Sequence, residues 1–428
     1  MLSVGLHRVL ILIALLSVLL ASCAPPAPGG NSTTSAGGII KVGLLAPVTG
    51  QGAASGQDMV NGWNLWWKLN GNKLCSGKTE IQTVFQDTAS VPDTARNKAR
   101  FLVEQSNVPF IVGPLFANEA LAVATYTKAK GIPIFWPVPS NDDFTQRQRS
   151  DLVIRIAGWT SSQPTHPFAD WIMQQHPNYK KFATIAADFI FGYESVGGFV
   201  NVATLRGAKI VKQVWNPTGT SDFSPYLPLV ANAGADAVFA TEVVADAPRF
   251  VKAWSDFGYK NKIPLFTSQN TTDQSQLRSM GSEAEGIISA GHYAEGRDDP
   301  ATQSFVQAFD KAYGQLPSYY AAALYTAAQW LSQGIEAVGC NISNQAAFLK
   351  AVRSIKLADS AFGPMSLDSY GNPIENIYIR KVVRRPDGRL WNVPIQTIPN
   401  VSQFYNFDPA QYLAHPPYTR DYKGVSSP

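Results

Sequence analysis

The chain has 428 residues with a formal net charge of +4, and 15% of its residues are charged. Its lysines and arginines form no long run, which argues against nucleic acid as a partner. The length is sufficient for two hydrophobic cores, so we expect two lobes rather than one small domain.

The first 22 residues predict the signal peptide of a lipoprotein. Arg8 precedes an apolar run at residues 9–20, and small residues then lead to Cys23. A helix of this length reaches only about 18 Å, whereas a hydrocarbon core is roughly 30 Å thick, so the run is too short to span a membrane. A short membrane anchor or a buried N-terminal helix is the alternative. The sequence Leu-Ala-Ser-Cys is a lipobox and favours lipidation at Cys23, which predicts an extracytoplasmic protein anchored to a membrane.

Residues 23–38 predict a flexible tether. They are rich in Pro, Gly, Ser and Thr and show no apolar periodicity. Such a segment buries too little surface to offset the chain entropy that ordering would remove. No later segment approaches eighteen consecutive apolar residues, so we expect the tether to hold a folded body outside the membrane.

Beyond the tether, short β-rich runs alternate with segments of helical periodicity, which predicts parallel sheets flanked by helices. Strands and helices alternate in the first half at residues 40–45, 57–69, 81–85, 94–105, 110–112, 118–130 and 132–135. A second series of strands follows at residues 182–187, 210–214, 237–240, 264–267 and 286–289. We therefore expect an α/β fold with two doubly wound sheets.

The loops that follow the predicted strands are the expected binding region. In open α/β sheets, ligands bind at the carboxyl ends of the strands, where loops and helix N-termini present free backbone N–H groups. The loops in question span residues 46–56, 114–118, 137–141, 188–193, 241–246 and 268–271.

Three tryptophans share one face of the first predicted helix. Trp63, Trp66 and Trp67 lie at i, i+3 and i+4, which is the spacing of a helix stripe. Such a stripe either stacks on a ligand or packs on the sheet beneath it. We favour packing, because an amphipathic helix of an α/β fold buries its apolar face.

Two cysteines remain after Cys23, namely Cys75 and Cys340. In an oxidising exterior, two leftover cysteines more often pair than stay free. Pairing also requires Cα atoms within about 7 Å of each other, which a sequence does not reveal. We therefore expect a disulfide, with two free thiols as the alternative.

The loops and strand ends carry an ordered series of motifs. They read KVGLLAPVTGQGAASG at 41–56, VEQSNVPFIVGP at 103–114, GIPIFWPVPSNDDFT at 131–145, RIAG at 155–158, DFIFGYESV at 188–196, NAGADAVFAT at 232–241 and FGPMSLDSYGNPIENIYIRKV at 362–382. In this order, behind a lipobox, they resemble the leucine/isoleucine/valine-binding protein family, type I periplasmic binding proteins of ABC importers. The resemblance spans nearly the whole mature chain.

The resemblance implies two Rossmann-like lobes with parallel-sheet cores, joined by a three-stranded hinge. Mapped by motif position, residues 39–157 plus 292–368 form lobe 1, and residues 158–291 plus 369–428 form lobe 2. The hinge crossings are expected near residues 156–159, 290–293 and 367–370.

The resemblance also implies a carboxylate-binding site in lobe 1. The family's hydroxyl residue after the Gly-Pro motif corresponds to Ala117, so backbone N–H groups of Ala117 and Asn118 remain as anion donors. The Asn118 side chain either replaces the hydroxyl or only caps a helix. Val138 and Ser140 map to a carbonyl and a hydroxyl of the next loop, where a simple turn is the alternative. Ser55 stands where the family often has an aromatic residue, which leaves room for a bulkier ligand.

In lobe 2 the resemblance implies an aromatic cover. Phe191 takes the place of an aromatic that covers the ligand, although core packing is equally open, and Val243 falls where a second aromatic is often found. Gln269 stands where amino-acid binders place a Glu for the ligand ammonium. A buried ammonium without a carboxylate costs several kcal/mol. Either Glu242 or Asp246 supplies the charge, or the ligand lacks an α-ammonium, as an aromatic or hydrophobic carboxylate does. We favour the second interpretation.

The expected function is a monomeric receptor that closes on a small organic ligand and delivers it to an ABC permease, with no cofactor or metal. An enzyme is disfavoured because the histidines of the mature chain are far apart and no metalloprotease, CxxC or nucleophile-elbow motif occurs. The alternative is a ligand-sensing receptor of the same fold that feeds a signalling partner.

Overall fold

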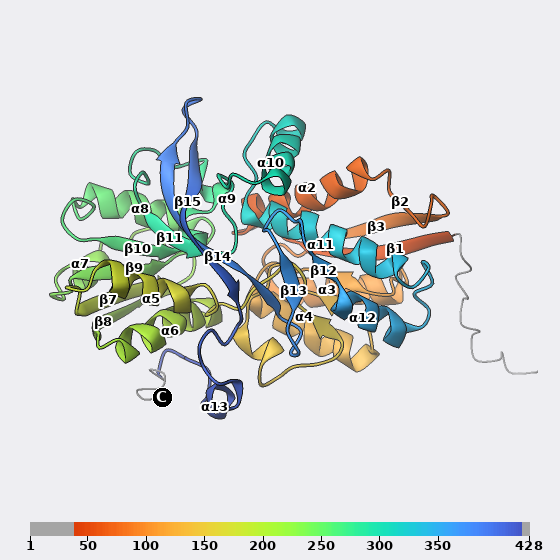
Figure 1. Cartoon of the computed structure of the whole chain (residues 1–428), viewed down its shortest axis with the longest axis horizontal. Helices are drawn as coiled ribbons and strands as arrows, with labels where there is room; N and C mark the ends of the chain where they lie inside the picture. The colour runs from red at the N-terminus through yellow and green to blue at the C-terminus, as the bar shows by residue number, and fades with distance from the viewer. Residues whose placement is uncertain (1–37, 422–428) are drawn as a thin grey trace, which may run out of the picture.

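The computed structural model describes residues 38–421. The expected signal peptide, Cys23 and almost all of the expected tether lie outside these described residues. Two lobes lie side by side, and the long strand β14 (Pro373–Arg384) runs between them (Figure 1). Within residues 38–421, no helix combines the length and the apolar character needed to cross a bilayer.

Lobe 1 is built on a six-stranded sheet of order β2-β3-β1-β4-β5-β6. All neighbours pair in parallel except β2 with β3. The strands are β1 (Gly38–Ala46), β2 (Lys73–Leu74), β3 (Thr79–Asp87), β4 (Ile111–Val112), β5 (Ile134–Phe135) and β6 (Val153–Ile154). The helices of this lobe are α2 (Ala53–Leu69), α3 (Pro92–Glu104), α4 (Ala117–Lys130), η1 (Asp142–Thr145), α10 (Pro300–Tyr313), α11 (Tyr319–Glu336) and α12 (Gln345–Ser354).

Lobe 2 is built on a second sheet of order β12-β13-β14-β11-β10-β9-β7-β8, with β15 paired to β14. Strands β7 to β11 are parallel, and β14 runs antiparallel to β11. The strands are β7 (Lys181–Ala187), β8 (Lys209–Asn216), β9 (Ala237–Thr241), β10 (Leu265–Ser268), β11 (Ile288–Gly291), β12 (Lys356–Leu357), β13 (Met365–Leu367) and β15 (Leu390–Val401). The helices are α5 (Thr165–Gln175), α6 (Ile190–Leu205), α7 (Leu227–Ala231), α8 (Asp246–Asp256), η2 (Gln269–Thr272), α9 (Gln274–Leu277) and α13 (Pro409–Ala414).

Helix α2 shows how the sequence fixes the lobe 1 core. Trp63 and Trp67 are buried in that core, and the Trp63 Nε1–H donates to Thr83 Oγ1 at 2.8 Å. The packing interpretation of this stripe is therefore confirmed. Gly62 allows α2 to approach α11, because a Cβ at Gly62 would lie 2.0 Å from the carbonyl oxygen of Ala321. The helix begins at Ala53 rather than at residue 57, so Ser55 lies in its first turn and not in a loop.

The chain passes between the two lobes three times within the described residues: after β6, after β11 and after β13. Strands β12 and β13 pair with the second sheet, but their buried residues Leu357 and Met365 pack in the lobe 1 core. Arg155, in the first crossing, is fully buried. Its guanidinium donates to the Pro139 carbonyl at 3.2 Å and to Asn372 Oδ1 at 2.6 Å. Because Asn372 belongs to the third crossing, these bonds tie two crossings to each other and to the loop after β5.

Cys75 and Cys340 form a disulfide, with their Cα atoms 6.3 Å apart. Cys75 follows β2 at the edge of the lobe 1 sheet, and Cys340 follows α11. The bond therefore staples the edge of the sheet to the helix that covers it, within lobe 1.

Candidate functional site

A small cavity of about 30 Å³ lies between the lobes, at the carboxyl ends of the strands. It is lined by the loops after β4 and β5 in lobe 1, by the loops after β7, β9 and β10 in lobe 2, and by the start of α11. The lining residues are Leu115, Phe116, Ala117, Val138, Ser140, Phe189, Phe191, Val243, Val244, Asn270, Tyr319 and Tyr320. Most of them are apolar or aromatic, which favours a ligand with an apolar, planar body.

The lobe 1 wall offers donors for an anion. Ala117 is the first residue of α4, so the backbone N–H groups of Ala117 and Asn118 have no backbone acceptor within the helix. Such N–H groups, at the positive end of a helix dipole, bind carboxylates. Ser140 adds a hydroxyl, which lies 3.1 Å from Ser161 Oγ. Asn118 is exposed, and its Oδ1 accepts the N–H of Glu119 at 2.9 Å, so it acts locally at the helix start.

The lobe 2 wall is an apolar cluster centred on Phe191. Its ring meets Trp159 edge to face at a centroid distance of 5.7 Å and lies 5.9 Å from Phe189. Val243 and Val244 belong to the same cluster. Val244 has a φ of +43°, which a β-branched residue rarely adopts. Strained backbone of this kind persists where the surroundings enforce it, typically at binding sites.

The remaining wall is polar. Asn270 Nδ2 donates to the Tyr319 hydroxyl at 3.0 Å, and Asn270 is only 4% exposed. Its Oδ1 is buried and has no hydrogen-bond partner among the described residues. Burial raises the pKa of the Tyr319 and Tyr320 phenols, so both keep their protons at neutral pH. An unpaired buried carbonyl oxygen is costly, so Asn270 would gain from a ligand that carries a donor.

Gln269 is turned toward the hinge. Its Nε2 lies 2.9 Å from His292 Nδ1, in the second crossing, and its carbonyl accepts from Arg380 at 2.6 Å. Burial lowers the pKa of His292 well below its usual value, so the ring is neutral and its Nδ1 can accept from Gln269. The ring also stacks on Phe362 at 4.7 Å and lies 5.2 Å from Trp159. Gln269 thus supports the wall behind the cavity.

The two carboxylates considered as partners for a ligand ammonium, Glu242 and Asp246, do not line the cavity. Glu242 is buried beside Asn216, whose Nδ2 donates to it at 3.1 Å, and burial raises the pKa of this carboxyl. Asp246 accepts the N–H of Gly219 at 2.7 Å. None of the described residues that line the cavity is acidic. In residues 38–421, no three His, Cys, Asp or Glu side chains gather in a way that would hold a metal.

The structure therefore divides the eight ligand residues expected from the sequence. Ala117, Val138, Ser140, Phe191 and Val243 line the cavity, whereas Ser55, Asn118 and Gln269 do not. Three further lining residues, Phe189, Val244 and Asn270, were not predicted individually, but they lie in loops that the sequence predicts to form the binding region. Tyr319 and Tyr320 lie at the start of α11. The one sequence feature that marks this helix start is Ser318, whose side chain caps the helix by accepting the Ala321 N–H.

Comparisons with known proteins identify similar chains. The family model described as periplasmic binding protein matches residues 39–388. Leu/Ile/Val-binding protein homolog 6 of Brucella abortus (strain 2308) is 29% identical over 368 residues, which cover 84% of this chain and 91% of that protein. Among solved structures, an ABC transporter substrate-binding protein from Sphaerobacter thermophilus is 28% identical with a TM-score of 0.79, covering 85% of this chain and 99% of that one.

A second solved structure contains a ligand. It is the solute binding protein of an ABC transporter from Rhodopseudomonas palustris BisB5, in complex with 3,4-dihydroxy benzoic acid. It is 27% identical with a TM-score of 0.80, and the match covers 85% of this chain and 98% of that one.

Proposed function

The chain belongs to the periplasmic binding protein family, and from that membership we propose that it captures a small aromatic carboxylate outside the cytoplasm and presents it to an ABC importer. The ligand binds in the cavity between the lobes. It bridges the two walls and so shifts the population from open to closed lobes, and the closed form docks on the permease. No covalent step is involved.

The observation that carries this proposal is the absence of an acidic residue among the described residues that line the cavity. A bound α-amino acid would bring an ammonium group with it. Burying that charge without a carboxylate costs several kcal/mol, because the lost hydration is not replaced by an ion pair. A carboxylate with an aromatic body avoids this cost, since its charge meets the N-terminus of α4 and its ring meets Phe191.

The polar wall narrows the ligand class further. Asn270 Oδ1 is an unpaired acceptor, and the phenols of Tyr319 and Tyr320 lie on the same side of the cavity. A hydroxyl on the ligand ring would donate to Asn270, so we infer that the ligand is a hydroxylated aromatic acid. The complex of the Rhodopseudomonas palustris protein with 3,4-dihydroxy benzoic acid supports this class. A branched-chain amino acid is the second candidate, favoured by the name of the Brucella relative.

Thermal-shift measurements and calorimetry on the mature protein test the proposal. We would compare 3,4-dihydroxybenzoate, 4-hydroxybenzoate, benzoate and leucine at pH 7.5. A ligand at 100 times its dissociation constant stabilises by about 2.7 kcal/mol, which a melting curve detects. We expect the two hydroxylated acids to bind more tightly than benzoate, and Asn270→Leu to remove that difference. Tight leucine binding together with no response to the aromatic acids would overturn the proposal.

We also propose that the receptor is a lipoprotein held to the membrane through Cys23. The lipobox and the polar segment after it support this, and both lie outside the described residues. Cys23→Ala should release the protein from washed membranes, as seen in a fractionation experiment. A variant that stays fully membrane-associated would contradict lipid anchoring without bearing on the ligand.

A further inference from the structure

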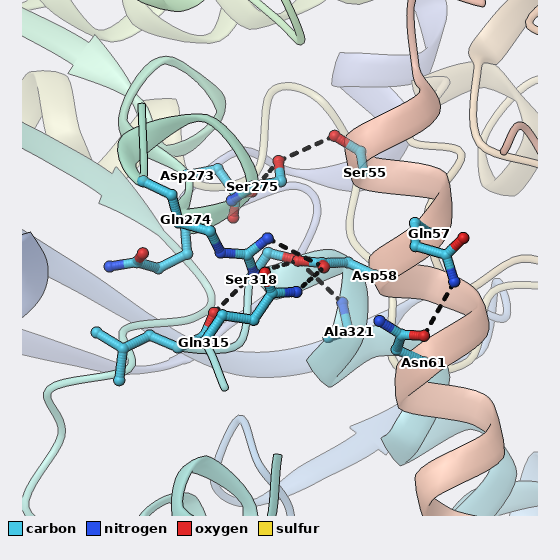
Figure 2. A network of polar contacts seen from close by, with 12 residues as sticks. Ser55, Gln57, Asp58, Asn61, Asp273, Gln274, Ser275, Gln315, Ser318 and Ala321 are labelled. Atoms are coloured by element: carbon cyan, nitrogen blue, oxygen red, sulfur yellow. Dashed lines mark hydrogen bonds and ion pairs between the residues drawn. The ribbon is translucent and has the colours of Figure 1, made fainter. Parts of the chain in front are cut away.

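Helix α2 of lobe 1 lies against α9 of lobe 2, and side chains of both lobes meet there (Figure 2). Arg278, just after α9, makes a two-point ion pair with Asp58 of α2: Nη1 lies 3.1 Å from Oδ1 and Nη2 lies 2.6 Å from Oδ2. Asp58 is 1% exposed, and the Arg278 side chain is 23% exposed. Gln315 donates to Asp58 at 3.2 Å, and Arg278 donates to the Leu316 carbonyl at 2.7 Å. This ion pair therefore joins the two lobes through residues that are 220 positions apart in the sequence.

Asp273 makes a second set of contacts between the lobes. Its carboxylate accepts the N–H and the hydroxyl of Ser275, at 2.9 and 2.6 Å, and so caps α9. The same carboxylate accepts the N–H of Tyr319 at 3.0 Å, which is the first residue of α11 in lobe 1. Ser275 Oγ also lies 2.9 Å from Ser55 Oγ, the contact drawn between α2 and α9 in Figure 2. One carboxylate thus caps a helix of each lobe.

We call these residues the latch: Ser55, Asp58 and Gln315 of lobe 1, with Asp273, Ser275 and Arg278 of lobe 2. None of the six lines the cavity. Opening of the lobes would break the contacts that cross between them, and the freed charges would return to water. The latch therefore contributes to the free energy of closure whatever ligand occupies the cavity.

We propose that Asp58 and Arg278 are positioning residues that set the fraction of receptor in the closed form, and thereby scale the affinity for every ligand by the same factor. The apparent dissociation constant equals the intrinsic constant divided by the fraction of binding-competent protein, so a smaller closed fraction weakens all ligands alike. A residue of the cavity wall differs, because its substitution changes the preference between ligands. Tyr319 links the regions, since its N–H is held by Asp273 and its ring lines the cavity.

The test uses Asp58→Asn and Arg278→Gln, with Asp256→Asn and Lys252→Gln as matched controls. The control pair makes the same charge changes within one lobe, in an exposed ion pair of 3.0 Å. Dissociation constants for 3,4-dihydroxybenzoate and 4-hydroxybenzoate come from calorimetry. We expect each latch variant to weaken both by about tenfold with an unchanged ratio, because coupling of this kind spans about 5- to 150-fold. The double latch variant should lose no more than either single one.

A second measurement needs no ligand, so it separates failure of the latch from failure of the proposed function. Small-angle scattering of the ligand-free protein should give a larger radius of gyration for the latch variants than for the wild type and the controls. Arg278→Lys keeps the positive charge but cannot make the two-point ion pair. It therefore tests the latch even if Asp58→Asn does not fold. An unchanged radius with unchanged affinities would overturn the proposal, and so would a changed ratio between the two ligands.

Discussion

The cavity and the latch both lie between the two lobes, but they are built differently. In the cavity, Phe116 of lobe 1 packs against the cluster of Phe191 and Val243 in lobe 2, through contacts that have little directional preference. In the latch, Asp58 and Arg278 meet in a single two-point geometry. Apolar walls can separate to admit a flat ligand, whereas an ion pair is either made or broken. Under the two proposals above, recognition and closure are carried by different residues, so each can be disturbed separately.

The largest expected effect lies outside both regions. Removing the disulfide by Cys75→Ser with Cys340→Ser should lower the free energy of unfolding by about 5 kcal/mol, because the bond closes a loop of 265 residues in the unfolded chain. Since the bond lies within lobe 1, ligand affinity and the ligand-free radius should not change. Denaturant unfolding, with calorimetry of the folded variant, checks this. A loss of affinity would mean that lobe 1 stiffness is part of recognition.

The next effect falls on the cavity alone. Phe191→Ala should weaken binding of 3,4-dihydroxybenzoate by about 100-fold, because it removes a buried aromatic contact at the centre of the lobe 2 wall. The ligand-free radius of gyration should stay at the wild-type value. Calorimetry is the measurement, and Phe257→Ala, at a 44% exposed position of lobe 2, is the control. A more open ligand-free protein would show that the cavity wall also holds the lobes closed.

A third contact between the lobes predicts a pH dependence. Glu194 of α6 accepts the N–H of Asp142 of η1 at 3.2 Å and the hydroxyl of Ser161 at 2.9 Å. Burial, followed by the charge of Asp142, raises the pKa of Glu194 well above its usual 4.5, and burial raises the pKa of Asp142 to about 6. Asp143 also faces the pair, and the buried Arg155 guanidinium acts on both carboxyls.

The folded protein therefore holds protons that the unfolded chain releases, and its stability falls as pH rises from about 4 through 6. Glu194→Gln is uncharged at every pH, so it should melt about 3 °C above the wild type at pH 7.5 and show a flatter pH profile. Melting curves from pH 4 to 8 measure this, with Glu80→Gln on an exposed site of β3 as the control. A profile of Glu194→Gln parallel to the wild type would assign the pH dependence to other groups.

Much of the fold was predictable from local pattern. The alternation of strands and helices places β7 and β9, and the loops after them, within a residue or two, because buried parallel strands are short apolar runs between turns. The residues that follow these strand ends, such as Ala117 and Phe191, line the cavity for the same reason. Whether a residue follows a strand end depends only on its position along the chain, so this property can be predicted from the sequence.

Contacts between distant segments were not predictable in the same way. Asp58 and Arg278 are 220 residues apart, and nothing in the sequence favours this pair over the many other combinations of an acidic residue with an arginine. Gln269 and Asn270 are neighbours in η2, yet one side chain turns to His292 and the other to the cavity. No periodicity in the sequence distinguishes them, because a short 3₁₀ turn takes its direction from tertiary packing. Ser55 is the same kind of case, with a first-loop position that becomes a helix position facing the other lobe.

Ser55 provides the smallest and most discriminating prediction. The sequence suggests a ligand residue, whereas the structure gives its hydroxyl to Ser275 at 2.9 Å, in the latch. A net hydrogen bond contributes about 1 kcal/mol, so Ser55→Ala should weaken 3,4-dihydroxybenzoate and 4-hydroxybenzoate alike, by about fivefold at most. Ser275→Ala should have the same effect, and the double variant should add nothing. If Ser55→Ala instead changes the ratio of the dissociation constants of the two acids while Ser275→Ala does not, Ser55 contacts the ligand and belongs to the cavity rather than to the latch.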